Sequence, residues 1–356
     1  MMARVNPKMV ELARISRGLS QTDFAKMLGI PQSTYSRVEA GLLPAADELV
    51  DAIATKLDYP RDFFFLDEQI HGAGTSALHY VYRRKQGLPA RTLRRIEAEA
   101  NIGRIRIKRL LANARVKTPH VIPTFSLDDY KSDVERIAQS VRGMWLLPRG
   151  PVENMTAAIE AAGGIVIRQD FGTDAVDATS FRFPGMPPLF FVNKKLCGDR
   201  QRYTLAHELA HLVMHPIPNP EMEEQADRFA AEFLMPKEDI KPSLHQFSLA
   251  KAANLKPYWK VSMWALIRRA FNLGTITESQ YRYLSMRMSA MGFRKQEPPE
   301  LDFPVEQPKT YEGLIEVHLK KLGYTLEDLS KLLVANVEIL QQQLSDPRSR
   351  LRLVAS

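Results

Sequence analysis

The sequence predicts an α+β protein that is mostly helical and divided into several domains. Short amphipathic stretches separated by glycines fill the first sixty residues. Two apolar, β-branched runs then precede a long helical pattern that contains HExxH, and helical patterns alone follow residue 275. A chain of 356 residues is too long for one ordinary hydrophobic core. We therefore expect domains at residues 1–68, 69–118, 119–274 and 275–356.

The composition indicates a cytoplasmic protein with no membrane partner. No run of eighteen apolar residues occurs, and the opening MMARVNPKMVELARIS carries charges at helical spacing where a signal peptide would be apolar. The single cysteine, Cys197, agrees with a reducing compartment and argues against a thiolate metal cluster. Any metal is therefore expected on histidine and carboxylate side chains.

Local signals near the N-terminus predict a small bundle of short helices. The four helical stretches are MVELARISRG, SQTDFAKMLG, IPQSTYSRVEAG and ADELVDAIATKL. Ser20 is a candidate N-cap with Asp23 three residues on, and Gly18, Gly29 and Gly41 stand where helices end in a left-handed residue.

The stretch GLSQTDFAKMLGIPQSTYSRVEAG resembles the Xre/Cro type of helix-turn-helix domain, a five-helix, lambda-repressor-like fold, over about residues 5 to 65. The resemblance implies that the protein binds a double-stranded DNA operator, with Gln21 at a helix start suited to a phosphate. It places the following recognition-helix residues at base edges: Gln32, Ser33, Thr34, Ser36 and Arg37. A helical protein-interaction module that does not bind DNA is the alternative.

The net charge of +8 comes from one basic segment, residues 61–120, which carry thirteen lysines and arginines against five acidic residues. An apolar seam with spacings of three and four runs through it: Leu93, Ile96, Ala100, Gly103, Ile107, Leu110 and Ala114. We expect a helix that packs on a twin in a homodimer or on the next domain. Basic residues off the seam are expected to face solvent, DNA phosphates or another anion: Arg94, Arg95, Arg104, Arg106, Lys108 and Arg109.

The middle of the chain predicts two helices, two strands and then a long helix. The helices are LDDYKSDVERIAQSVRGMW and ENMTAAIEAAGG, and the strands are IVIR and PLFFVN. In the long helix, RYTLAHELAHLVMH, residues His207, Glu208 and His211 form HExxH. Positions four apart share a helix face, so both imidazoles can bind one Zn²⁺ while Glu208 lies beside the open site. Glu208 is then expected to be the general base.

A catalytic zinc site needs a third protein ligand, and the helical pattern EMEEQADRFAAEFLMP offers several acidic residues. Glu223 and Asp227 lie one turn apart, so that one carboxylate can bind the metal while the other orients a ligand histidine. Glu224 points about a hundred degrees away from Glu223 and is the weaker candidate. Without a metal, these acidic residues would only complement the helix dipole.

The motifs RQRYTLAHELAH and ExxADxFAAxFLMP resemble the ImmA/IrrE family of metallopeptidases, and the resemblance covers about residues 120 to 290. It implies a zincin-like domain with a small sheet and one Zn²⁺ per chain on His207, His211 and Glu223, with Glu208 as the catalytic base. Members of the family cleave a partner repressor of the Xre type, whereas here an Xre-like domain lies on the same chain.

Three neighbouring residues have weaker claims to the site. His215 lies one turn beyond His211 and is expected mainly to end the helix or to serve the structure, although a place near substrate or a proton path is open. Tyr203 could stabilise a tetrahedral intermediate but is expected to be packed, and Cys197 is expected to be an ordinary small residue.

The C-terminal region predicts a helix in TITESQYRYLSMRMSAMGF, then a proline-rich linker and an accessory pair of helices in GYTLEDLSKLLVANVEILQQQL. The latter echoes GLSQTDFAKML without its turn glycine. This region is expected to serve partner binding.

The whole sequence predicts a zinc-dependent endopeptidase fused to a sequence-specific DNA-binding domain, a transcriptional regulator that cleaves a repressor, in trans or itself, in a stress or mobile-element response. The alternative is a non-proteolytic Xre-type regulator whose peptidase-like domain is a sensor or a dimerisation module. An intact HExxH favours chemistry, because a sensor has no need of Glu208. Part of a toxin–antitoxin module is a third hypothesis.

Overall fold

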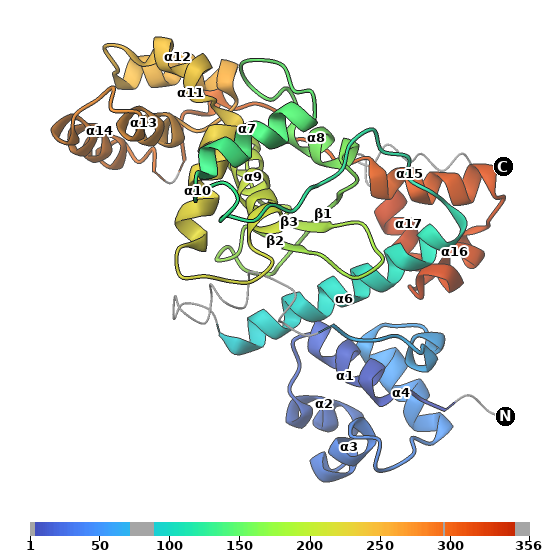
Figure 1. Ribbon diagram of the computed structural model, residues 1–356. Helices are drawn as coiled ribbons and strands as arrows, with labels where there is room; N and C mark the ends of the chain where they lie inside the picture. Colours follow the sequence, from blue (N-terminus) through green and yellow to red (C-terminus); the bar gives the residue numbers. More distant parts are fainter. Residues whose placement is uncertain (1–3, 72–88, 295, 346–356) are drawn as a thin grey trace. The chain divides into compact units, whose positions relative to one another are not determined.

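The computed structural model describes residues 4–71, 89–294 and 296–345, which form two compact units (Figure 1). Of these residues, the first unit holds 4–71, 89–116 and 310–345, and the second holds 117–294 and 296–309. The units cut across the expected domains: residues 89–116 of the expected basic linker belong to the first unit, and the expected C-terminal region is divided at residue 310. Among the described residues, every helix is too short or too polar to span a bilayer.

All regular secondary structure among the described residues of the first unit is helical. It begins with α1 (Pro7–Ser16), α2 (Gln21–Leu28), α3 (Gln32–Glu39), α4 (Asp47–Leu57) and the 3₁₀ helix η1 (Arg61–Phe65). It continues with α6 (Ala90–Asn113), α15 (Thr310–Glu316), the π-helical turn η5 (Val317–Lys321), α16 (Leu326–Leu333) and α17 (Val337–Ser345). The expected five-helix N-terminal domain is therefore confirmed.

The N-terminal helices begin and end where the local signals predicted. The Ser20 side chain caps α2 by accepting a hydrogen bond from the Asp23 backbone N–H, and α2 ends at Gly29, whose φ of 70° lies in the left-handed region. Because Gly29 has no Cβ, the chain turns sharply there and the backbone N–H of Ile30 reaches back to the carbonyl of Ala25. The result is the tight connection that sets α3 against α2.

A buried ion pair joins the first and third helices. The Arg14 guanidinium donates to both carboxylate oxygens of Glu39, at 2.9 and 2.5 Å, and also to the backbone carbonyl of Leu19. Both side chains are less than a tenth exposed. Beside this pair, the rings of Phe24 and Tyr35 meet edge to face at 5.2 Å. These contacts fix α3 on the rest of the domain.

Helix α6 packs on helices of its own chain, which is the intramolecular alternative to packing on a twin. Most of the seam is buried, but the helix also buries a second row, Ala98, Ile102 and Ile105, in the same core as α1, and it packs on α15 and α16. It therefore packs within its own unit.

The expected solvent-facing arginines of α6 are largely engaged in this packing. Arg104 is only 3% exposed and pairs with Glu68 and the Gln69 carbonyl. Arg106 and Arg109 donate to backbone carbonyls at the end of α16. The expectation that these side chains are free to bind phosphates is therefore wrong for Arg104, Arg106 and Arg109.

The C-terminal pair α16 and α17 repeats the turn of the N-terminal pair. Val334 adopts the left-handed conformation, with φ 44°, in the place that Gly29 takes after α2. The Ala335 backbone N–H bonds the Ser330 carbonyl at 3.2 Å, as Ile30 bonds Ala25. The similarity between the two sequence segments thus extends to the turn, although the left-handed conformation is sterically unfavourable for valine.

The second unit contains a three-stranded sheet covered by helices. Its strands are β1 (Ile165–Gln169), β2 (Ala178–Phe181) and β3 (Leu189–Asn193), in the spatial order β1-β3-β2. β1 pairs parallel to β3 with Ile165 opposite Leu189, and β2 pairs antiparallel with Ala178 opposite Val192. Its α-helices are α7 (Val134–Met144), α8 (Met155–Ala161), α9 (Gly198–Met214), α10 (Met222–Leu234), α11 (Lys237–Ile240), α12 (Leu249–Trp259), α13 (Met263–Asn272) and α14 (Glu278–Ala290).

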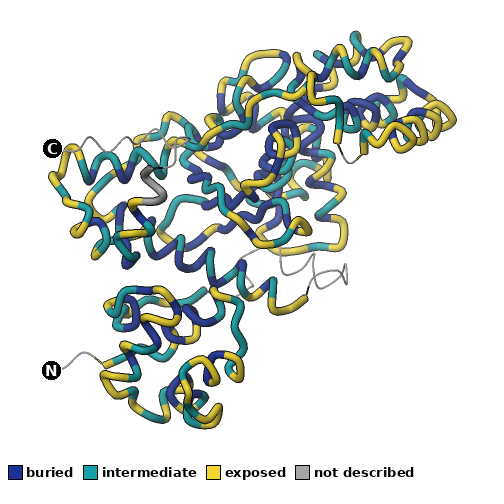
Figure 2. Tube along the Cα trace, turned by 180° about the vertical axis from the view of Figure 1, so that it is seen from behind, coloured by how far each residue is buried: buried dark blue, intermediate teal, exposed yellow. Residues whose placement is uncertain are grey.

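Helix α9 lies at the centre of this unit, between the sheet and α10. It contacts β2, β3, α8 and α10, and α10 packs in turn on α7. Both strands predicted from the sequence are present, whereas β2 was not predicted. Helix α7 begins at Val134, later than expected, because Lys131 and Ser132 have positive φ and Asp133 caps the helix. Buried residues run through the centre of the unit, while α14 is largely exposed (Figure 2).

Residues 296–309, which include the 3₁₀ turn η4 (Pro299–Leu301), anchor the start of α9 through buried charges. Lys256, which is fully buried, lies 2.8 Å from Asp199 in the first turn of α9 and 2.8 Å from Glu297. Arg202, also fully buried, pairs with Glu306. A Cβ on Gly198 would lie 2.8 Å from the Phe303 carbonyl oxygen, so only glycine fits at this crossing. The segment thus holds the long helix at its N-terminal end.

Candidate metal centre and recognition helix

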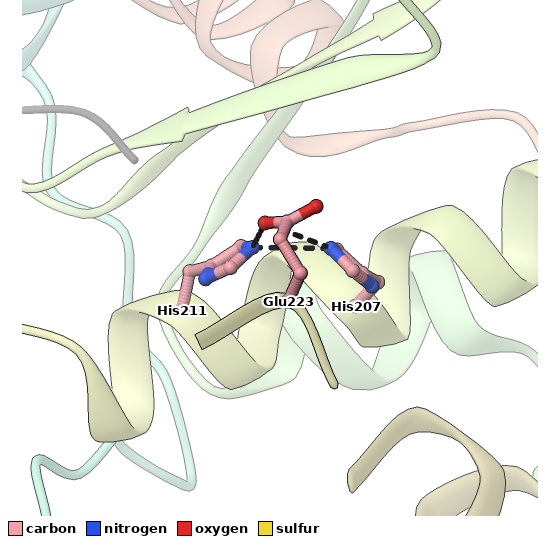
Figure 3. A group of neighbouring side chains, drawn as sticks. All are labelled: His207, His211 and Glu223. Atoms are coloured by element: carbon pink, nitrogen blue, oxygen red, sulfur yellow. Dashed lines mark hydrogen bonds and ion pairs between the residues drawn. The ribbon is translucent and has the colours of Figure 1, made fainter. Parts of the chain in front are cut away.

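Two elements bring together the three residues that the sequence analysis proposed as ligands. His207 and His211 lie one turn apart on α9, and Glu223 lies in the first turn of α10 (Figure 3). The two Nε2 atoms are 3.1 Å apart, and Glu223 Oε1 lies 3.2 Å from Nε2 of His211 and 3.9 Å from Nε2 of His207. The three donor atoms therefore face one point, within 4.8 Å of one another.

The spacing of these donors fits a zinc ion. Zinc binds imidazole nitrogen and carboxylate oxygen at about 2.0–2.1 Å, so tetrahedral geometry separates neighbouring ligand atoms by about 3.3 Å. The distances of 3.1, 3.2 and 3.9 Å bracket that value. Two imidazoles and one carboxylate also form the donor set of catalytic zinc sites that keep a fourth position open. The residues present thus fit one zinc ion with a free coordination position.

The electrostatics of the three residues favour a positive charge between them. Burial lowers the pKa of His207, but its hydrogen bonds to Asp227 and Glu223 outweigh this and raise that pKa to about 10. Burial raises the pKa of Glu223, but contacts with the two histidines hold it well below its usual range. The groups that stabilise a proton on His207 would stabilise a divalent cation in the same way.

Asp227 and Tyr203 support the first of the two histidines. Asp227 Oδ1 accepts a hydrogen bond from Nδ1 of His207 at 2.9 Å, which directs Nε2 of that ring toward Glu223. The Tyr203 hydroxyl donates to the Asp227 backbone carbonyl at 3.2 Å, and its ring packs against the core of the unit. Tyr203 is therefore packed, as the sequence analysis expected. Glu224 is exposed and does not belong to the donor group.

The second histidine has a different support. Nδ1 of His211 lies 3.0 Å from Nδ1 of His215, and Nε2 of His215 lies 2.8 Å from Oε1 of Gln225. His215 is the C-cap of α9, which agrees with a helix-end role. Burial, followed by the neighbouring charge of His211, lowers the pKa of His215 to about 4. His215 is therefore neutral at physiological pH.

Glu208 contacts a residue that the sequence analysis did not identify. The Ser180 hydroxyl of β2 donates to Oε2 of Glu208 at 2.7 Å, and Ser180 is only 3% exposed. Glu208 also lies close enough to His207 to raise its pKa. The sequence offered little indication of this contact, because Ser180 lies in a four-residue strand with no alternation of apolar residues. Gln225 was missed too, although it lies in the same helical pattern as Glu223.

Cys197 precedes α9 and takes no part in the donor group. Its thiol donates to Oδ1 of Asp199 at 2.9 Å. Partial burial of the sulfur and this hydrogen bond raise the pKa of Cys197 to about 11. The thiol is therefore protonated at neutral pH.

The proposed DNA-contacting residues share one region of the first unit. Gln21 is the first residue of α2 and Gln32 is the first residue of α3, and Nε2 of Gln32 donates to Oε1 of Gln21 at 3.2 Å. Along α3 the side chains of Tyr35 and Val38 are buried. The expected base-contacting side chains are exposed or half-buried: Gln32, Ser33, Thr34, Ser36 and Arg37.

Comparison with known proteins locates two families on the chain. Residues 10–64 match the profile described as helix-turn-helix, and residues 159–271 match a peptidase profile described as IrrE N-terminal-like domain. No curated protein sequence matches the chain significantly. The first match covers most of α1, all of α2–α4 and most of η1, and the second covers the strands, α9 and α10. The chain therefore joins an Xre-type helix-turn-helix domain to an ImmA/IrrE-like peptidase domain, in that order, which is the make-up of a regulator with a peptidase-like domain.

Proposed function

We propose that the second unit is a zinc-dependent endopeptidase and that the first unit directs it to an operator. The observation that carries the enzymatic half is the convergence of His207, His211 and Glu223 on one point, with Glu208 on the same helix. A sensor or a dimerisation module would need neither the donor group nor the serine that holds Glu208. One Zn²⁺ per chain is the cofactor that the donor spacing supports.

Each residue has a defined task in peptide hydrolysis. His207, His211 and Glu223 would hold the ion, which would supply Lewis-acid activation of the water and the scissile carbonyl. The Glu208 carboxylate takes a proton from the attacking water and passes it to the nitrogen of the leaving amine. Asp227 keeps His207 oriented, and Ser180 keeps one carboxylate oxygen of Glu208 in place.

The substrate we propose is a repressor of the Xre type, either a separate protein or this same chain. The support is the presence of an Xre-type domain and a peptidase domain on one polypeptide. Cleavage would relieve repression in a stress or mobile-element response. DNA, repressor and peptidase would then meet in the cytoplasm.

The enzymatic half is tested by comparing zinc content and cleavage in the full-length protein. Wild type, Glu208→Gln, Glu223→Gln and the matched control Glu224→Gln are loaded with zinc and incubated alone or with a library of proteome-derived peptides. New N-termini are identified by mass spectrometry. We expect wild type and Glu224→Gln to cleave, Glu208→Gln to keep one zinc but lose cleavage, and Glu223→Gln to bind zinc weakly.

Two results would contradict this half of the proposal. One is wild-type protein that binds no zinc at a concentration where other zinc peptidases are loaded. The other is cleavage by Glu208→Gln at the wild-type rate, because the proton transfer would then not depend on this carboxylate.

The DNA-binding half rests on the polar face of α3, and it is tested separately. A duplex is selected from a random library by the full-length protein and its affinity is measured for wild type, Gln32→Ala, Arg37→Ala and the exposed control Lys56→Ala. A lost bidentate base contact costs about 1–3 kcal/mol, so we expect affinities about tenfold lower for the α3 variants and an unchanged affinity for the control. A homodimer that reads two half-sites is part of the proposal, and sedimentation of the protein–DNA complex measures it.

A further inference from the structure

The hydrogen bonds around His211 form an ordered path that ends at the side chain of Gln225. Nδ1 of His211 contacts Nδ1 of His215 at 3.0 Å, and Nε2 of His215 contacts Oε1 of Gln225 at 2.8 Å. The three residues are only 5%, 7% and 7% exposed, so water has little access to these contacts. Each ring nitrogen on this path therefore depends on its protein partner.

The contacts of Gln225 fix which atom donates and which accepts at the end of this chain of hydrogen bonds. The Gln225 amide nitrogen lies 3.4 Å from Oε2 of Glu221, a carboxylate oxygen that only accepts. The amide oxygen consequently points the other way, where Asn219 Nδ2 also donates to it at 3.2 Å. An amide oxygen can only accept, so Nε2 of His215 must carry the proton.

The direction of this hydrogen bond also affects the direction of the next one, between the rings of His215 and His211. Two ring nitrogens in contact need one donor and one acceptor, and Nδ1 of His211 faces Nδ1 of His215. With the proton of His211 on Nδ1, this nitrogen donates to Nδ1 of His215, and the lone pair of His211 lies on Nε2. That atom is the one that faces Glu223 at 3.2 Å and His207 at 3.1 Å.

We propose that Gln225 and His215 are positioning residues that hold His211 in the tautomer and orientation needed to bind a metal through Nε2. The inference rests on the proposed function, because it assigns these residues to the same metal centre. His207 is oriented by a carboxylate, whereas His211 is oriented by a histidine and an amide. The centre thus has two kinds of support, of which only the first adds a negative charge.

The test uses full-length protein with three substitutions. Gln225→Met keeps the volume of the side chain but removes the acceptor, His215→Phe removes the link to His211, and His215→Asn keeps an oxygen acceptor near the place of Nδ1. The zinc dissociation constant is measured by competition with a chromophoric chelator. The ring nitrogens of ¹⁵N-labelled histidines are assigned by long-range ¹H–¹⁵N NMR spectra, with and without zinc.

We expect wild-type His211 to carry its proton on Nδ1 in the absence of zinc. Gln225→Met and His215→Phe should weaken zinc binding about tenfold, as loss of an orienting partner typically does, and should populate the other tautomer. His215→Asn should recover most of the affinity. Thermal unfolding of the zinc-free proteins checks that the variants fold.

The proposal is overturned if folded Gln225→Met and His215→Phe bind zinc as wild type does and His211 keeps its tautomer. It is also overturned if wild-type His211 carries its proton on Nε2. Failure of the proposed function looks different, since wild type itself would then bind no zinc whatever the NMR spectra show.

Discussion

The hydroxyl of Ser180 on the edge strand β2 donates a hydrogen bond of 2.7 Å to Oε2 of Glu208 on α9. A hydrogen bond to a charged group contributes about 1.5–3 kcal/mol. Ser180→Ala should therefore lower kcat about tenfold or more, because Glu208 would lose its fixed orientation, while zinc content stays at one per chain. Turnover of a cleaved library peptide and zinc analysis provide the measurement.

Ser180→Thr serves as the control for this prediction, because it keeps the hydroxyl and suits a strand. We expect Ser180→Thr to keep most of the activity. Equal turnover in wild type and Ser180→Ala would show that Glu208 needs no support from β2.

Asp227 should strengthen zinc binding without being a ligand. Its carboxylate orients His207 through Nδ1, and its side chain is 63% exposed, so solvent screens part of its charge. We expect Asp227→Ala to raise the zinc dissociation constant about tenfold and Asp227→Asn to raise it less, since the amide oxygen can still accept the hydrogen bond. The exposed neighbour Glu224→Gln should leave it unchanged. An affinity of Asp227→Ala equal to that of wild type would refute this role.

The Arg14–Glu39 pair should be the most sensitive polar contact of the helix-turn-helix domain. Removing one partner leaves a buried charge, which typically costs about 3–5 kcal/mol. Arg14→Ala and Glu39→Ala should each expose α1 and α3 to hydrogen exchange, measured by mass spectrometry of peptides from these helices. The double variant Arg14→Ala/Glu39→Ala should lose less free energy of unfolding than the two single variants lose together. Strict additivity would mean that the two charges do not stabilise one another.

Cys197 should be unreactive at neutral pH although the residue is exposed. Its pKa is raised to about 11, so the thiol stays protonated below that pH, and the reactive thiolate forms only as the pH approaches it. The rate of alkylation by iodoacetamide should thus be far below that of glutathione at pH 7.5 and should still be rising at pH 10. Alkylation that levels off near pH 8.5 would contradict the raised pKa.

The features that the sequence predicted well depend on local signals. Ser20, Gly29 and the HExxH spacing each act within a few residues, so the cap, the turn and the shared helix face could be read directly. To predict Glu223 as a ligand, it was enough to recognise the helix that follows the HExxH helix in the sequence. These residues account for the recognition helix and for the donor group.

The features that were missed depend on partners far along the chain. β2 is a strand because it pairs with β3, and its four residues show no strand pattern of their own. Arg104 is buried because Glu68 and the Gln69 carbonyl are there to receive it. Ser180 and His215 gain their importance from the side chains of Glu208 and Gln225, which only the folded chain places beside them.

The chain passes from the first unit into the second and back again, which limits the effect of a single cleavage of the backbone. The described part of the peptidase unit, residues 117–294 and 296–309, lies in the sequence between α6 and α15, which belong to the same compact unit. Severing the backbone at residue 116 alone would leave the helix-turn-helix joined to the remainder through the packing of α6 on α15 and α16. Because α1 also packs on α6 in a shared core, release of the N-terminal helices by self-cleavage would require, besides a cut, that α6 separates from α1 or from α15 and α16.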